Sequence, residues 1–95
     1  MIEKYISRST EIAARMLGGE TIVMSTRDST LFTLNETATA IWEAADGRTT
    51  LREIVERKVC PEFEVEPEAA CRDAEELVEG LASHGILLVS ERPIA

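Results

Sequence analysis

The chain has 95 residues, of which 44% are apolar, and its 10 basic and 18 acidic side chains give a formal net charge of −8. A chain of this length holds one compact core, so we expect a single domain over residues 1–95. It lacks both the roughly 20 consecutive apolar residues of a membrane-spanning helix and, in residues 1–10, the apolar segment of a signal peptide. We therefore expect a cytoplasmic protein without membrane contact.

The charge is concentrated in the second part of the chain. Residues 1–34 contain four basic and four acidic side chains, so the whole formal charge of −8 belongs to residues 35–95. Eight acidic residues lie between Glu62 and Glu79, and only Arg72 opposes them there. Such a surface repels phosphate, which argues against nucleic acid as a ligand.

The first third of the chain predicts a three-stranded meander. Glu11–Leu17 and Thr21–Ser25 flank Gly18-Gly19, a pair that reaches positive φ without steric cost and suits a hairpin turn. A turn at Arg27-Asp28 leads into a third strand, Ser29–Leu34, which is rich in β-branched and bulky apolar residues. Because side chains alternate across a strand, this one has apolar groups on both faces and needs cover or a partner on each.

Helical periodicity follows. Asn35 can cap a first helix, and Gly47 fits the residue just past its end. Thr50 and Glu53 form a capping box that opens a second helix, and Pro61 is expected to stop it. The second helix is expected to bury Leu51, Ile54, Val55 and Val59.

A third helix is predicted from Pro67 to about His84, with Gly85 ending it. Residues 86–89 form a short apolar run that adds an edge strand or packs against the core, whereas residues 1–10 show no clear periodicity. The expected apolar arc of the third helix comprises Ala70, Cys71, Ala74, Leu77, Val78, Leu81 and Ala82.

The order of these elements predicts the fold class. Three strands and then three helices, joined by short connections, indicate an α+β domain with a three-stranded antiparallel sheet followed by three helices. Short links between consecutive helices also suit a winged-helix-like arrangement.

The sequence contains no catalytic constellation. His84, the only histidine, stands at a predicted helix C-terminus, where a structural role is expected. Cys60 and Cys71 lack the spacing of a metal or redox motif, so we interpret them as half-buried apolar residues, with a regulatory disulfide as the alternative. We predict a protein that is not an enzyme and holds no cofactor and no metal.

From Thr26 onward the sequence resembles the PqqD family, also called the RiPP recognition element (RiPPs are ribosomally made, post-translationally modified peptides). The stretch that carries the resemblance is residues 31–42, LFTLNETATAIW, where two bulky residues precede leucine-asparagine-glutamate and isoleucine-tryptophan. Further matches are Asp46-Gly47, residues 50–54, Asp73-Ala74, Leu77-Val78, Leu81 and residues 85–87.

The resemblance implies a non-catalytic domain that binds the leader part of a precursor peptide. The leader is expected as an added strand along the third strand, in a groove bounded by the third helix. The domain then presents the peptide to a modifying enzyme, which for the namesake is a radical SAM protein of pyrroloquinoline quinone biosynthesis. Strand addition would also give an exposed sheet edge a use.

The resemblance can be carried over to individual positions. Leu31 or Phe32 would line the groove, and the sequence leaves that choice open. Gly80 would permit close approach of another backbone, or else is a tolerated surface glycine. Acidic side chains at the rim would prefer basic leader residues. The implied peptide-binding residues are Ser29, Thr30, Leu31, Phe32, Thr33 and Leu34 on the strand, and Asp73, Glu76, Leu77, Gly80 and His84 on the helix.

Two positions depart from the family pattern. The paired aromatics of the strand are Leu31-Phe32 here, and the bulky aromatic of the last helix is Leu77. These departures indicate a shallower pocket or a different anchor residue in the peptide. They favour a related peptide-modification pathway over pyrroloquinoline quinone synthesis itself. The runner-up is a winged-helix nucleic-acid binder, which requires a basic recognition helix. A third possibility is a homodimer formed through the same strand edge.

Overall fold

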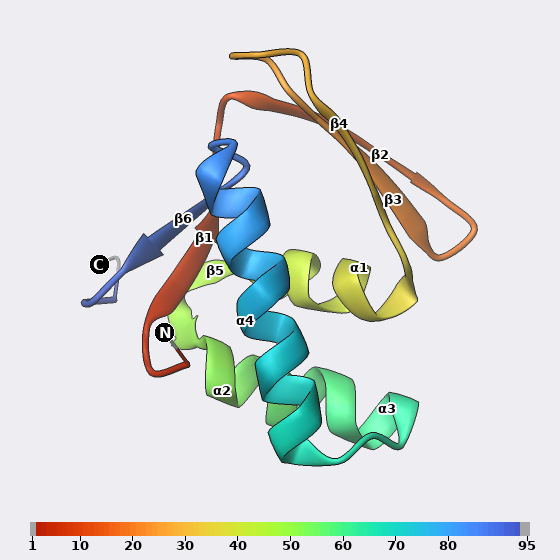
Figure 1. Ribbon diagram of the computed structural model, residues 1–95, viewed down its shortest axis with the longest axis vertical. Coiled ribbons are helices and arrows are strands. Elements are labelled where there is room, and N and C mark those ends of the chain that lie inside the picture. Colours follow the sequence, from red (N-terminus) through yellow and green to blue (C-terminus); the bar gives the residue numbers. More distant parts are fainter. Residues whose placement is uncertain (1, 94–95) are drawn as a thin grey trace.

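The computed structural model describes residues 2–93 (Figure 1). The strands are β1 (Tyr5–Arg8), β2 (Ile12–Leu17), β3 (Glu20–Ser25), β4 (Leu31–Leu34), β5 (Asp46–Thr50) and β6 (Leu87–Ser90). The helices are α1 (Glu36–Glu43), α2 (Leu51–Ile54), the π-helical segment η1 (Val55–Val59), α3 (Cys60–Phe63) and α4 (Pro67–Ser83).

The predicted meander is confirmed as the antiparallel sheet β2-β3-β4. Gly18 and Gly19 have φ of 59° and 89°, so the hairpin uses both glycines in the backbone region that other residues avoid. The third strand begins at Leu31 and not, as predicted, at Ser29. Ser29 has a φ of 60°, and the Asp28 carboxylate accepts a hydrogen bond from the Thr30 N–H at 3.0 Å, which holds both residues in the turn.

A second three-stranded sheet, β5-β1-β6, was not predicted. β1 falls within residues 1–10, where the sequence shows no clear periodicity, and β5 contains Gly47 at a φ of 78° instead of leaving it at the end of α1. The expectation that residues 86–89 add an edge strand is confirmed, since β6 pairs with β1.

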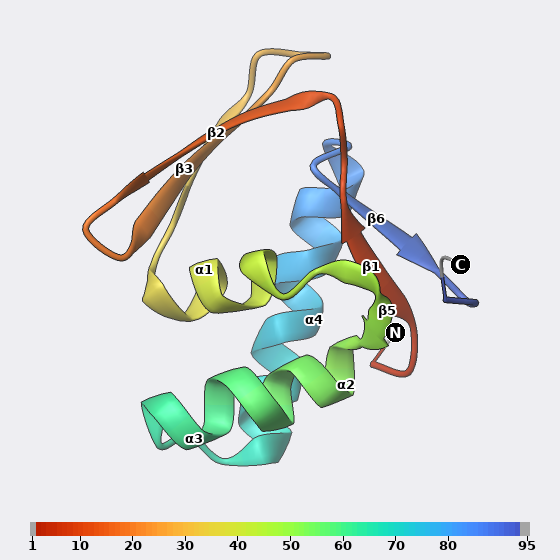
Figure 2. The same ribbon diagram turned by 180° about the vertical axis from the view of Figure 1, so that it is seen from behind.

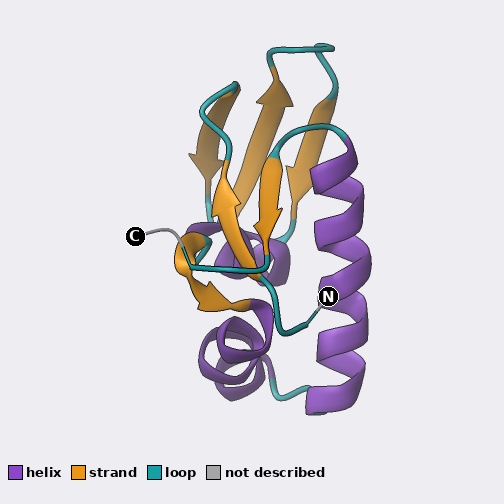
Figure 3. Cartoon of the chain, turned by 90° about the vertical axis from the view of Figure 1, so that its left-hand side faces the viewer, coloured by secondary structure: helices purple, strands orange, loops and turns teal. Residues whose placement is uncertain are grey.

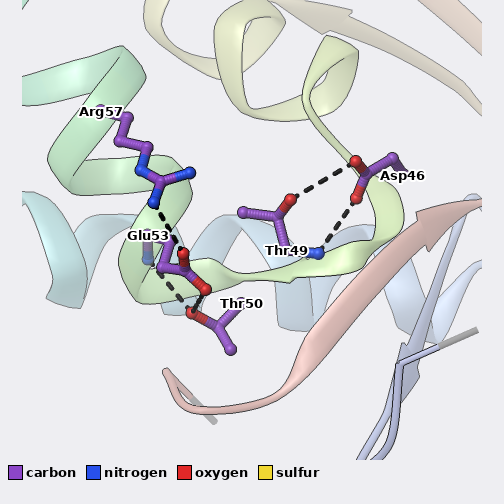
Figure 4. Close-up of polar contacts among 5 residues, drawn as sticks. All are labelled: Asp46, Thr49, Thr50, Glu53 and Arg57. Carbon is purple, nitrogen blue, oxygen red and sulfur yellow. Dashed lines mark hydrogen bonds and ion pairs between the residues drawn. The ribbon is translucent and has the colours of Figure 1, made fainter.

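The capping box that opens α2 is present (Figure 4). Thr50 Oγ1 accepts a hydrogen bond from the Glu53 N–H at 3.2 Å, and the Glu53 carboxylate lies 3.2 Å from Arg57. In the preceding strand the Asp46 carboxylate accepts the N–H of Thr49 at 3.0 Å and its hydroxyl at 3.4 Å. These contacts fix the path of the chain from β5 into the helix.

Pro61 does not end the second helix, so that expectation was wrong. α2, η1 and α3 follow one another without a break, and the helix ends at Glu64, whose φ is 49°. The N–H of Cys60 bonds to the carbonyl of Val55, five residues earlier. This wider π turn, directly before the proline, lets the helix continue through a residue that has no N–H to donate.

The helices cover one face of the β2-β3-β4 sheet, and α1 lies between that sheet and the α2-α3 segment (Figure 2). α4 runs from the α3 end of the molecule to the turn that leads into β6, and the β2-β3-β4 sheet extends beyond it (Figures 1 and 3). Its buried side consists of Ala70, Ala74, Val78 and Leu81, as the predicted arc requires. Within residues 2–93, no helix combines the length and the apolar character needed to cross a membrane.

Candidate functional site

β4 forms an edge of its sheet, and within residues 2–93 it pairs with β3 alone. The N–H of Ser25 donates to the carbonyl of Thr30 at 2.9 Å, and this fixes the alternation of backbone groups along the pair. The backbone N–H and C=O groups of Phe32 therefore point toward β3, whereas those of Leu31 and Thr33 point outward from the edge of the sheet. A strand placed beside β4 would find donors and acceptors at these two residues.

The two faces of β4 differ, and Leu31 and Phe32 lie on opposite faces. Leu31 is 61% exposed and lies on the face that no helix covers. Phe32 is half-buried, packs against the core, and places its ring centroid 5.0 Å from that of His84 at an interplanar angle of 62°. Phe32 is thus the residue on the α4 side.

A polar contact lies at the His84 end of α4, and we call it the clasp. His84 Nδ1 lies 3.1 Å from Asp28 Oδ2, and this contact joins the β3-β4 turn to the end of α4. The Thr30 N–H, followed by the contact with His84, holds the pKa of Asp28 well below its usual range. Arg27 also packs over Gly85, where Nη1 lies 2.9 Å from the position that a Cβ would occupy.

A hollow of about 280 Å³ lies between the first turns of α1, the end of η1, the segment before α4 and α4 itself. Its lining is mainly apolar, with Asp73 among the polar groups. The lining residues are Asn35, Thr37, Ala38, Ile41, Val59, Val65, Ala70, Asp73 and Leu77.

The predicted helix residues form a stripe along α4. Leu77 and His84 are half-buried, whereas Asp73, Glu76 and Gly80 are exposed. An α-helix rises about 16 Å from position 73 to position 84, whereas a four-residue strand such as β4 spans roughly 10 Å, so the stripe is longer than the strand. Outside its own helical turn, Gly80 has no atom within 4 Å of the place where a Cβ would stand. No contact within the described chain therefore requires a glycine at this position.

The structure brings the predicted residues together in two groups. Phe32 and His84 meet beside the clasp, and Asp73 and Leu77 line the hollow. Sequence reasoning missed the hollow, although Val65, a 41% exposed apolar residue within an acidic segment, offered a signal. It also left out Asp28, which was identified only as part of a turn.

Among the described residues, the cysteines and the acidic side chains form no disulfide and no metal-binding group. Cys60 and Cys71 are free, half-buried and packed against the core, and burial raises the pKa of the Cys71 thiol. Among residues 2–93, no three histidine, cysteine or acidic side chains are grouped so that they could hold a metal ion. On α4, Arg72 stands among Glu68, Asp73, Glu75, Glu76 and Glu79, a charge pattern that disfavours phosphate.

An open strand edge beside an amphipathic helix defines a class of domain that can accept an extended peptide as an added strand. The family model described as Coenzyme PQQ synthesis protein D (PqqD) matches residues 20–87, and the chain belongs to this family. Among solved structures, "TbiB1 in Complex with the TbiA(beta) Leader Peptide" is similar, with a TM-score of 0.75 and 22% sequence identity. That similarity covers 85% of this chain and 93% of the other, and it shows a shared fold. No curated protein matches the chain.

Proposed function

We propose that this chain is an adaptor that binds the leader segment of a ribosomally made precursor peptide and presents it to a modifying enzyme. The observation that carries the proposal is the open edge of β4, where backbone groups of Leu31 and Thr33 point outward beside the α4 stripe. Membership of the PqqD family supports it. Further support comes from TbiB1, a protein of the same fold whose structure contains a leader peptide.

In this proposal the leader lies as a strand along β4, and its residues alternate between two environments. Every second side chain enters the gap between Phe32 and Leu77, where apolar groups bury surface. The acidic residues Asp73 and Glu76 at the rim favour a lysine or arginine in the leader. Ser29–Leu34 form one wall, and the α4 stripe from Asp73 to His84 forms the other.

In this proposal residues 1–95 form one binding domain, which acts in the cytoplasm and performs no catalytic step. Chemistry belongs to the partner enzyme. The family resemblance indicates a radical SAM protein for that role, in pyrroloquinoline quinone biosynthesis or in a related peptide pathway.

Titration calorimetry with synthetic leader segments, taken from precursor peptides encoded beside the gene, tests the proposal. We expect micromolar binding by one leader. Proline at leader positions whose N–H pairs with β4 should weaken it, because proline cannot donate, whereas proline at the alternate positions should weaken it less. If none of the neighbouring leaders bound, the adaptor function would be rejected.

A further inference from the structure

The opposite edge of the same sheet, β2, is also unpaired and is more exposed than β4. Five of its six residues are exposed, and Met16 and Leu17 are 51% and 52% exposed. β2 pairs with β3 in continuous register without a bulge, and it contains neither proline nor lysine. A bulge, a proline or a lysine is what usually keeps an edge strand from pairing with another strand. β2 therefore has the properties of a strand that takes a partner.

The backbone groups available on β2 follow from its pairing with β3. The N–H of Thr26 donates to the carbonyl of Glu11 at 3.1 Å, so the groups of Glu11 point toward β3. Alternation along the strand then directs the groups of Ile12, Ala14 and Met16 outward. An antiparallel strand placed here would form its hydrogen-bonded pairs with these three residues.

We propose that β2 pairs with β2 of a second copy of this chain, and that a two-fold axis relates the two copies. This pairing joins the two sheets into one. With Ala13 opposite Ala13 of the second copy, Ile12 faces Ala14 in a hydrogen-bonded pair. Glu11 then faces Arg15 in a non-hydrogen-bonded pair, where side chains lie closest. The two-fold axis forms this ion pair twice. The alternative with Ala14 on the axis would place Leu17 opposite Glu11 and form neither ion pair.

Glu11 and Arg15 are both exposed, as this pairing requires. Arg27 lies 4.0 Å from the Glu11 carboxylate within the same chain. Because that contact is long and its side chains are 64% and 63% exposed, Glu11 remains open to a second cation.

The charge distribution favours pairing of two copies through β2 and disfavours pairing through β4. Each copy carries a net charge of −8, but residues 1–34 sum to zero. Two copies that met at β4 would bring their acidic α4 helices together, whereas two that met at β2 would join their neutral parts. Pairing through β2 leaves both β4 edges open, so a leader peptide and a second copy can bind at the same time.

Sedimentation of the full chain tests the proposal, in a concentration series that reaches about 1 mM because an interface of one short strand pair holds weakly. We expect the dimer fraction to rise with concentration. Arg15→Glu and Glu11→Arg should each weaken dimerisation about tenfold, because each places like charges opposite one another. The double variant, E11R with R15E, restores opposite charges and should restore the dimer.

Arg48→Glu is the matched control, since it makes the same charge change on β5 and should leave the dimer unchanged. Circular dichroism verifies that each variant is folded. A chain that stays monomeric at the highest concentration would overturn the proposal. So would a dimer that ignores Arg15→Glu, or one that a leader peptide dissociates, because the latter result would place the interface at β4. Leader binding to a monomer would leave the adaptor function intact.

Discussion

The two edges of the β2-β3-β4 sheet present the same chemistry, a row of unpaired N–H and C=O groups, in different surroundings. β4 has four residues and lies beside a helix whose exposed side is acidic. β2 has six residues, and the charge of its Arg15 is balanced by Glu11, which directly precedes the strand. The backbone supplies affinity at both edges, whereas the neighbouring side chains determine which partner fits. We therefore propose that the acidic wall selects a basic peptide at β4 and that the self-complementary charges select a second copy at β2.

The largest effect is expected from the side chain on the α4 side of β4. Phe32→Ala should weaken leader binding by roughly 2 kcal/mol or more, the loss typical of a central aromatic contact. Leu31→Ala is the matched control, because Leu31 lies on the opposite face and its backbone groups are retained. Titration calorimetry measures both, after circular dichroism has shown that Phe32→Ala is folded. Equal losses for the two variants would remove the distinction between the faces of β4.

The acidic rim should give the next effect. Asp73→Lys is expected to weaken binding of a basic leader by about 1 kcal/mol, the upper range for an exposed ion pair, and the loss should shrink as salt is added. Glu20→Lys makes the same charge change at the β2-β3 turn and should leave the affinity unchanged. A similar loss from both variants would mean that net charge, rather than the rim of the β4 edge, attracts the peptide.

Replacing Gly80 is expected to change the stability of the fold and the affinity for the leader in opposite directions. Gly80→Ala should raise the free energy of unfolding by up to about 1 kcal/mol, because alanine favours a helix interior and a Cβ meets no atom at this position. The same change should lower leader affinity a few-fold if a peptide backbone approaches α4 closely. Chemical denaturation and calorimetry measure the two quantities. A stabilised variant with unchanged affinity would identify Gly80 as an ordinary surface glycine.

The smallest effect is expected from the Asp28 carboxylate of the clasp, whose contribution to stability should be lost in acid. Because the folded-state pKa of Asp28 lies below that of the unfolded chain, its contribution to stability is present above a pH of about 4 and is lost as the pH falls through the folded pKa. The melting temperature of Asp28→Asn should therefore approach that of the wild type as the pH is lowered below 4. A constant difference between the two chains across this range would show that the Asp28 charge does not stabilise the fold.

The strands and helices that the sequence predicted are those with strong local signals. The paired glycines, the Asn35 cap and the Thr50-Glu53 capping box each act over a few residues, and the structure contains all three. β1 and β5, which were not predicted, have only four and five residues, and β1 pairs with segments far along the chain. Such strands are fixed by long-range pairing, for which a short sequence carries no periodic signal.

Prediction of the candidate site had a similar limit. The resemblance indicated the strand and the helix stripe, but it left Leu31 and Phe32 undecided because both are bulky and apolar. The register of β4 against β3 decides which side chain faces α4. The hollow beside Asp73 depends on how α1, α4 and the segment between α3 and α4 pack together. Such tertiary packing is not readable from any one of these segments.

Amide hydrogen exchange measured by NMR, with and without a bound leader, tests the central claim most directly. At concentrations where the chain is monomeric, binding should slow exchange at the Leu31 and Thr33 amides, because their N–H groups gain acceptors from the added strand. The Ile12, Ala14 and Met16 amides at the other edge should exchange as before. A leader that binds without slowing Leu31 and Thr33, or that slows the β2 amides instead, would contradict strand addition at β4.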